Sequence, residues 1–128
     1  MLHLFWSSPT PARLATVPGM RLVTLKRRTL DGGADLTWVA TLAGLQGAHV
    51  HGAQLDAGDT LPRHPTPVWQ VFAVLSGTGE VAGQDDVRRP IGPGTAAVWS
   101  PGEEHTSWAV TDMVVVIVQS DAEPTIDP

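Results

Sequence analysis

The sequence contains no cysteine, so a disulfide, a thiolate metal ligand and a thiol nucleophile are all excluded. It also lacks any run approaching the roughly 18 apolar residues that a membrane-spanning helix needs. The apolar start, Met1–Trp6, has no basic flank and stops at a Ser-Ser-Pro sequence, so it does not predict a signal peptide. We therefore expect a cytoplasmic protein without a membrane partner, whose fold depends on packing alone.

Basic side chains are also few. The chain has 8 Lys and Arg against 13 Asp and Glu, for a net charge of −5. Binding to a nucleic-acid backbone needs a basic surface, so we expect no nucleic-acid partner. The one basic run, Lys26–Arg28, is short, and we interpret it as a solvated strand end or turn.

Sustained helical periodicity is absent, apart from a possible helical turn at Pro11–Ala15. The 13 glycines and 11 prolines are scattered between short runs rich in Val, Thr, Trp and Leu, a pattern typical of a β-sandwich or barrel. The predicted strands are Met20–Leu25, Leu36–Leu42, Ala48–Leu55, Trp69–Leu75, Gly79–Ala82, Val87–Ile91, Ala96–Trp99, Thr106–Val110 and Met113–Gln119. Residues 1–128 are predicted to form one all-β domain, with an N-terminal arm over residues 1–20 and a flexible polar tail over residues 121–128.

Two stretches contain the side chains that could bind a metal or a ligand. The first runs from Gly58 to Gly77, and the second from Gly94 to Ala109; together they contain these candidates: His64, Thr66, Gln70, Gly102 and His105. In spacing and order the two stretches resemble the two motifs of the cupin superfamily. The first has the spacing of the family motif glycine, five residues, His-x-His, three or four residues, Glu, six residues and Gly. The second has the spacing of the motif glycine, five residues, Pro-x-Gly, two residues, His, three residues and Asn.

The resemblance implies a cupin-type double-stranded β-helix, that is, a jelly-roll barrel, which forms a homodimer. It also implies one divalent transition metal (Zn, Fe, Mn or Ni) bound by His64, Gln70 and His105. The chain departs from the family pattern at four positions, which are Thr66 for His, Gln70 for Glu, Ser100 for Pro and Ala109 for Asn.

These departures change the expected chemistry of the site. Two neutral imidazoles and one amide oxygen are plausible ligands for a transition metal, but they carry no negative charge. A bound ion would keep its full +2 charge, so we expect weaker metal affinity and a stronger pull on an anionic ligand. Alternatively, Gln70 is a polar residue that closes a hydrogen-bond network in the core.

Side-chain directions favour one shared pocket. Gln70 and Phe72 lie on one face of their strand by alternation, and His64 and Thr66 share a face because each precedes a proline and is extended. Thr66 and Phe72 are therefore predicted to line the pocket, together with Trp99 and Trp108, which flank the second stretch. His51, which shares a strand face with His49, is a further candidate ligand that would supply the nitrogen Thr66 lacks; the alternative is that both are exposed or merely packed.

The predicted function is binding of a divalent metal, a small anionic or polar molecule, or both inside the barrel. Metal-dependent oxygenase, isomerase or lyase chemistry is possible, and the resemblance does not choose among these reactions. The alternative is a non-catalytic ligand-binding or structural member that has lost its metal. Glu103-Glu104 is either a general base at the pocket mouth or, as we expect, a solvated turn. Dimerisation is predicted through Leu2–Trp6 and Met20–Leu25, because apolar edge strands need a cover.

Overall fold

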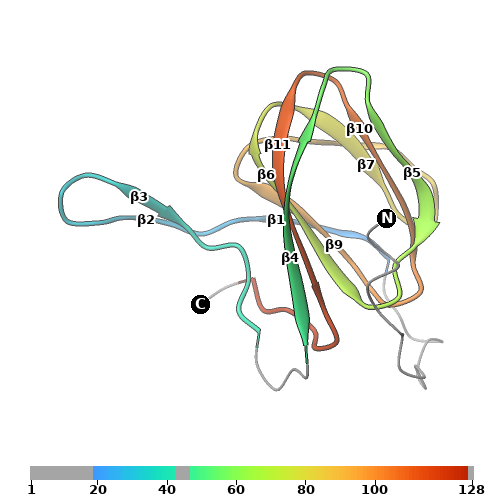
Figure 1. Ribbon diagram of the computed structural model, residues 1–128, viewed down its shortest axis with the longest axis horizontal. Helices are drawn as coiled ribbons and strands as arrows, with labels where there is room; N and C mark the ends of the chain where they lie inside the picture. Colours follow the sequence, from blue (N-terminus) through green and yellow to red (C-terminus); the bar gives the residue numbers. More distant parts are fainter. Residues whose placement is uncertain (1–18, 43–46, 127–128) are drawn as a thin grey trace.

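The computed structural model describes residues 19–42 and 47–126, and all their regular structure is β-strand (Figure 1). The strands are β1 (Arg21–Thr24), β2 (Arg27–Thr29), β3 (Asp35–Thr37), β4 (Ala48–Leu55), β5 (Thr60–Pro65), β6 (Trp69–Ser76), β7 (Gly79–Ala82), β8 (Arg89–Ile91), β9 (Thr95–Trp99), β10 (Glu104–Ala109) and β11 (Met113–Ser120). Within this described part, no helix has the length and apolar character needed to cross a membrane.

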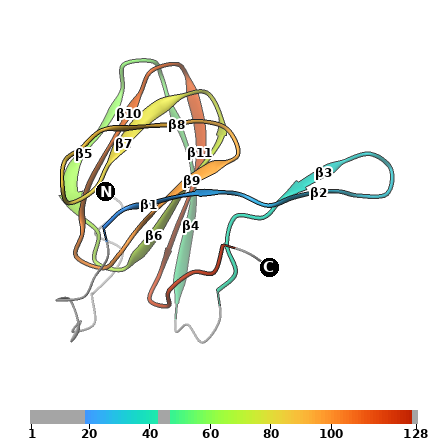
Figure 2. The same cartoon turned by 180° about the vertical axis from the view of Figure 1, so that it is seen from behind.

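Two larger antiparallel sheets face each other and enclose the main core (Figures 1 and 2). The first sheet has the strand order β1-β9-β6-β11-β4, and the second has the order β5-β10-β7-β8. The prediction of an all-β fold is confirmed. Among the described strands, however, the hydrogen-bonded ladder does not run from one sheet into the other, so they form a pair of open sheets, consistent with a jelly roll, where we expected a closed barrel.

The five-stranded sheet is apolar on both faces, because successive residues of a strand point to opposite sides. On β11, Val115 and Ile117 face the second sheet, whereas Val116 and Val118 belong to a second cluster on the outer face. A strand buried on both faces reads as a continuous apolar run, which the Met113–Val118 sequence does.

The inner core comprises Leu55, Phe72, Val74, Val81, Ile91, Ala97, Trp99, Ala109, Met113, Val115 and Ile117. The outer cluster is centred on Leu25, Val71, Ala73, Ala96, Val98 and Val118, and Val39, Ala40, Leu42 and Ile126 pack against it. Each fully buried Val, Leu, Ile, Phe or Met side chain in these clusters stabilises the fold by about 1.5–3 kcal/mol relative to exposure. The segment around residues 38–42 is therefore a cover for the sheet.

Some predicted boundaries are confirmed, and others are wrong. The strands Ala48–Leu55 and Gly79–Ala82 have the predicted bounds. The predicted strand Leu36–Leu42 is shorter: only Asp35–Thr37 form a strand, and Val39, Ala40 and Leu42 pack on the outer face. The predicted strands do not include Thr60–Pro65, although the residue before Pro65 is predicted to be extended; this strand lies at the edge of its sheet, where proline is tolerated.

The β2–β3 hairpin projects away from the two large sheets (Figures 1 and 2). The tail differs from the predicted frayed segment: Pro124 is buried, and Thr125 forms a two-hydrogen-bond bridge with Thr41, at 2.6 and 2.9 Å. The predicted helical turn at Pro11–Ala15 and the terminal strand at Leu2–Trp6 lie outside the described residues.

Candidate functional site

His64 and His105 come together through the pairing of strands β5 and β10. They are direct cross-strand partners in this antiparallel pair, and their ring centroids are 4.3 Å apart at an angle of 56°. Directly opposed residues of antiparallel strands point to the same side of the sheet. His105 is 2% exposed, and His64 is partly exposed, so the pair connects the interior to the surface.

The five-stranded sheet presents four further residues in one cross-strand row. The register aligns His49 of β4 with Gln119 of β11, Gln119 with Gln70 of β6, and Gln70 with Trp99 of β9. All four share the alternation of the inner core, so they face the second sheet. We call His49, Gln119, Gln70, Trp99, His105 and His64 the polar row.

A chain of hydrogen bonds joins the two halves of the polar row. His105 Nδ1 lies 3.3 Å from the carbonyl oxygen of Glu103, and His105 Nε2 lies 3.3 Å from Nε2 of Gln70. Gln70 Oε1 in turn accepts a 3.0 Å bond from Nε2 of Gln119. The indole of Trp99 packs against the His105 ring, with centroids 4.4 Å apart. The row is thus a connected polar network at the end of an apolar core.

Burial keeps His105 neutral. Desolvation of the ring, the nearby His64 and the Arg63 charge together lower the pKa of His105 from its ordinary 6.5 to about 4, against the raising effect of its bond to Glu103. At neutral pH the ring therefore carries one proton. The Glu103 carbonyl can only accept, so that proton lies on Nδ1 and the lone pair on Nε2.

His64 has the same local arrangement. Its Nδ1 lies 2.6 Å from the carbonyl oxygen of Pro62, two residues earlier, just as Nδ1 of His105 lies near the carbonyl of Glu103. Metal-binding histidines commonly donate one ring N–H to a carbonyl in this way, which fixes the tautomer and leaves the other nitrogen for the metal. Both imidazoles are thus oriented like metal ligands.

Gln70 does not complete a metal site in the arrangement found. Its NH2 group, not its oxygen, faces Nε2 of His105, the atom that a metal would need. Across the described ranges, 19–42 and 47–126, no group of three or more His, Asp or Glu side chains that could hold a metal ion occurs. The donor set therefore does not fit a divalent metal as it stands, and the interpretation of Gln70 as part of a hydrogen-bond network matches this geometry.

The other candidates lie at different places. Thr66 is buried, and its hydroxyl donates to the Val68 carbonyl at 2.6 Å, which turns it toward its own backbone. Phe72 lies one row below Gln70, beside Trp99, with ring centroids 5.9 Å apart. Trp108 pairs with Glu80 and Thr60, and its ring lies under Arg88, so it faces away from the polar row.

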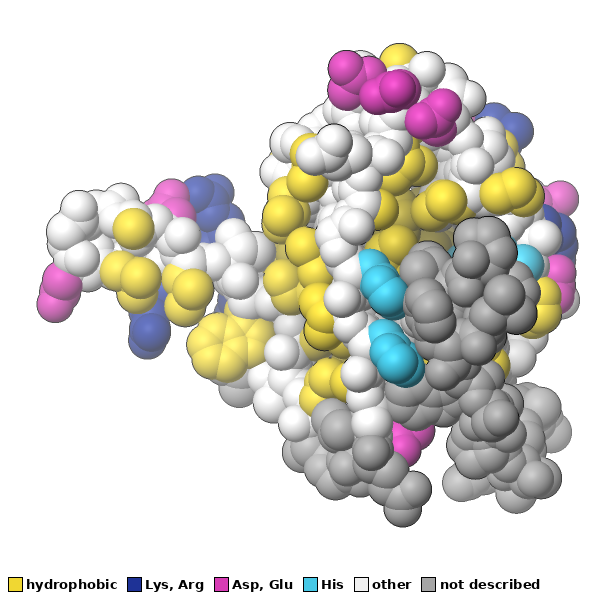
Figure 3. Space-filling model, in the orientation of Figure 1, with side chains coloured by type: hydrophobic (Ala, Val, Ile, Leu, Met, Phe, Trp, Pro, Cys, Tyr) yellow, Lys and Arg dark blue, Asp and Glu magenta, His cyan; other side chains and the backbone are white. Residues whose placement is uncertain are grey.

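The register also separates the two histidines of β4. His51 is aligned with Ile117, one row below, whereas His49 is aligned with Gln119. Their rings stack with centroids 6.3 Å apart, and both side chains are partly buried. Histidine side chains are visible at the surface beside β4 (Figure 3). His49 rather than His51 is therefore the histidine of this strand that belongs to the polar row.

Glu103 is not the solvated turn residue that we expected. It is 3% exposed, and its carboxylate accepts bonds from the backbone amides of Ser100, at 3.0 Å, and Gln84, at 3.3 Å. Burial raises the pKa of this carboxyl, and the amide bonds oppose the rise. Glu103 thus ties the β9–β10 turn to the β7–β8 loop, whereas neighbouring Glu104 pairs with Arg63 at 3.5 Å.

Sequence reasoning missed Gln119 and His49. The alternation of side chains along β11 could have revealed Gln119. Val115 and Ile117 face inward, so Gln119, two residues after Ile117, also faces inward. For His49 the pairing register was needed, because its parity is shared with His51. Both residues join the site only through contacts between strands far apart in sequence.

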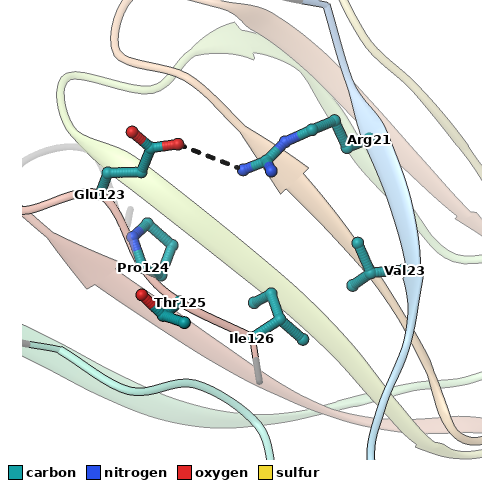
Figure 4. A pocket seen from close by; sticks show the side chains of 6 residues that line it. All are labelled: Arg21, Val23, Glu123, Pro124, Thr125 and Ile126. Carbon is teal, nitrogen blue, oxygen red and sulfur yellow. Dashed lines mark ion pairs between the residues drawn. The ribbon is translucent and has the colours of Figure 1, made fainter. Parts of the chain in front are cut away.

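A pocket of about 420 Å³ lies elsewhere, between β1 and the C-terminal segment (Figure 4). It is lined by Arg21, Val23, Glu123, Pro124, Thr125 and Ile126. Arg21 and Glu123 pair across it at 3.8 Å. The register of β1 places Arg21 and Val23 opposite the outer-face residues Val98 and Ala96, so this pocket is separate from the polar row.

Comparison with known proteins identifies the fold. The model of the cupin domain family matches residues 53–119, just over half of the chain, including every member of the polar row except His49. No curated protein matches the sequence. A conserved Streptococcus pyogenes protein of unknown function superimposes with a TM-score of 0.56 and 22% identity, over 81% of this chain and 75% of that one.

Two further structures are similar. A cupin superfamily protein from Desulfitobacterium hafniense has a TM-score of 0.55 and 9% identity, over 79% of this chain and 76% of its own. KdgF from a Halomonas species has a TM-score of 0.55 and 22% identity, over 64% and 76%. At these identities the likeness is evidence of the fold alone.

Proposed function

This chain belongs to the cupin domain family, and we propose that it binds a small polar molecule at the polar row between its two sheets. The observation that supports this is the hydrogen-bond chain from Glu103 through His105 and Gln70 to Gln119, which lies beside the apolar inner core. Buried polar groups are costly in low-dielectric surroundings, and apolar replacements of similar shape are often as stable. A ligand gives such a network a role.

The ends of the network are consistent with access from solvent. His64 and His49 are partly exposed, whereas Gln70, His105 and Gln119 are each at most 3% exposed. A ligand that enters beside either histidine meets hydrogen-bonding groups that are already oriented, so little freedom is lost on binding. Because His105 is neutral, it has no charge to pair with an ionic ligand and recognises its partners by hydrogen bonds.

The proposal is tested by ligand-observed and protein-observed NMR with a library of small polar metabolites. We expect binders to shift the side-chain resonances of Gln70 and Gln119, and Gln70→Met to lose the binding. The matched control is Gln54→Met, because Gln54 is exposed on β4 and should leave binding unchanged. Binders that act equally on both variants, or a library without any binder, would contradict the proposal.

A divalent metal (Zn, Fe, Mn or Ni) at His64, Gln70 and His105 is the second candidate. The matching Nδ1–carbonyl contacts of both histidines favour it, but Gln70 would have to turn its oxygen toward His105. The test is elemental analysis of untagged protein prepared without chelator, beside His64→Ala and His105→Ala. Stoichiometric metal that both variants lose supports a metal centre and possible Lewis-acid catalysis; no metal, even after addition, leaves the non-catalytic ligand-binding function.

We also propose that the protein works in the cytoplasm as a homodimer. Strand β1 lies at the edge of its sheet, and the β2–β3 hairpin exposes Leu30 and Leu36. Two-stranded hairpins are marginally stable alone in water, so a second copy would give this one a partner. Light scattering should give a dimer mass that falls to a monomer in a Leu30→Ser, Leu36→Ser double variant. A monomeric unmodified protein would contradict this.

A further inference from the structure

Two buried polar atoms of the polar row lack hydrogen-bond partners. Within the residues that the structure describes, Nε1 of Trp99 and Oε1 of Gln119 are both inaccessible and without a bond. The two residues are 0% and 2% exposed. An unsatisfied buried donor or acceptor costs about 1–3 kcal/mol, and native structures contain few of them. Their occurrence in one row indicates that a missing group completes the network.

The direction of the hydrogen-bond chain determines what Gln119 offers. The Glu103 carbonyl can only accept, so Nδ1 of His105 donates to it and Nε2 of the neutral ring must accept. Gln70 therefore directs its NH2 group to His105 and its oxygen to Gln119. Gln119 must then donate through Nε2, which leaves its oxygen as an acceptor at the end of the chain.

Trp99 offers the complementary group. Its indole Nε1 carries a hydrogen and can only donate. The register places Trp99 and Gln119 on the two strands that flank the strand of Gln70. Neighbouring strands lie about 4.8 Å apart. The row therefore presents an unpaired donor and an unpaired acceptor on the two strands that flank Gln70. A hydroxyl group both accepts and donates, so it matches this pair.

We propose that Trp99 and Gln119 are the hydroxyl-recognition pair of the ligand site, and that the ligand is an uncharged or anionic small molecule with one or more hydroxyl groups, such as a polyol or a hydroxy acid. This inference rests on the proposed ligand-binding function. The Trp99 N–H donates to the hydroxyl oxygen, and the hydroxyl, or a neighbouring one, donates to Oε1 of Gln119. A molecule without a hydroxyl leaves both protein atoms unsatisfied.

The test compares probes with and without a hydroxyl group: lactate with propionate, and lactamide with propionamide. The readout is the indole N–H resonance of Trp99 in ¹⁵N-labelled protein, assigned with Trp99→Phe. The internal control is the indole resonance of Trp108, which lies outside the row under Arg88. We expect the probe with the additional hydroxyl to bind about tenfold or more tightly and to move the Trp99 proton downfield, because a site built for a hydroxyl rejects the analogue without it.

A second variant separates Gln119 from the rest of the row. Gln119→Met keeps the side-chain length but removes the amide, so the preference for the hydroxylated probe should fall to near unity; Gln54→Met is the matched control. Equal affinity of paired probes, or a preference unchanged in Gln119→Met, overturns the hydroxyl pair while the proposed function stands. The same holds if probes bind but leave the Trp99 resonance unmoved, as when ordered water fills the position. If no polar molecule perturbs any residue of the row, the proposed function fails as well.

Discussion

The buried neutral state of His105 makes the stability of the protein depend on pH in a specific way. The pKa of this ring is about 4 in the folded protein and near 6.5 when the ring is exposed on unfolding. Below pH 6.5 the unfolded chain therefore binds a proton at His105 that the folded chain does not bind until the pH approaches 4. His105 contributes stability that is fully present above pH 6.5 and is lost as the pH falls toward 4.

The size of the effect follows from the two pKa values. With these values, the loss in unfolding free energy from His105 is about 2 kcal/mol between pH 7 and pH 5, and about 3 kcal/mol by pH 4. Such a loss is a large fraction of the 5–15 kcal/mol that stabilises typical domains. Other groups also titrate in this range, and Glu103, whose folded-state pKa is raised, acts in the opposite direction.

The difference between the wild type and His105→Gln isolates this contribution. Both proteins are unfolded with urea at pH 7, 6, 5 and 4, in the presence of a chelator, and followed by tryptophan fluorescence. The variant is expected to be less stable at pH 7 but to lose about 2 kcal/mol less than the wild type on going to pH 5. NMR titration of the ring gives the folded-state pKa directly. Parallel pH profiles for the two proteins, or a ring that titrates near 6.5, would refute the buried neutral state.

Three further predictions concern single residues. Gln70→Glu places a carboxylate beside His105 Nε2, so the pKa of His105 should rise from about 4 toward or above 6.5. The pKa is measured by NMR titration, and an unchanged value would show that the two side chains are not in contact. Glu103→Ala leaves the backbone amides of Ser100 and Gln84 without their acceptor, so the unfolding free energy should fall by about 2 kcal/mol or more. Urea unfolding measures this loss, and a value below about 0.5 kcal/mol would mean that the carboxylate is in solvent. Gly77→Ala should lower the unfolding free energy by roughly 3 kcal/mol or more, because Gly77 has a φ of +81° and an added Cβ would collide with the backbone of Asp112. A melting temperature within about two degrees of the wild type would contradict this local geometry.

Local patterning was sufficient for much of the fold. Alternating and continuous apolar runs located β4, β7 and β11 closely, since burial on one or both faces selects residues strand by strand. Leu36–Leu42 was misassigned because an apolar segment that covers a sheet has the same composition as a strand within it. The sequence also could not predict that the two sheets stay open, because closure of a barrel depends on how the edge strands of the two sheets meet.

For the site, the resemblance of two stretches to the cupin motifs predicted that His64 and His105 meet, and they do, at 4.3 Å between ring centroids. The sequence by itself determined the all-β class, the family and these two imidazoles, because strand patterns and motif spacings are local properties of the chain. Only the tertiary structure decided the partner of each group. It brought Gln119 and His49 into the row, turned the amide of Gln70 toward His105, and placed Trp108 outside. Cross-strand register and desolvation arise between segments distant in sequence, so no local pattern encodes them.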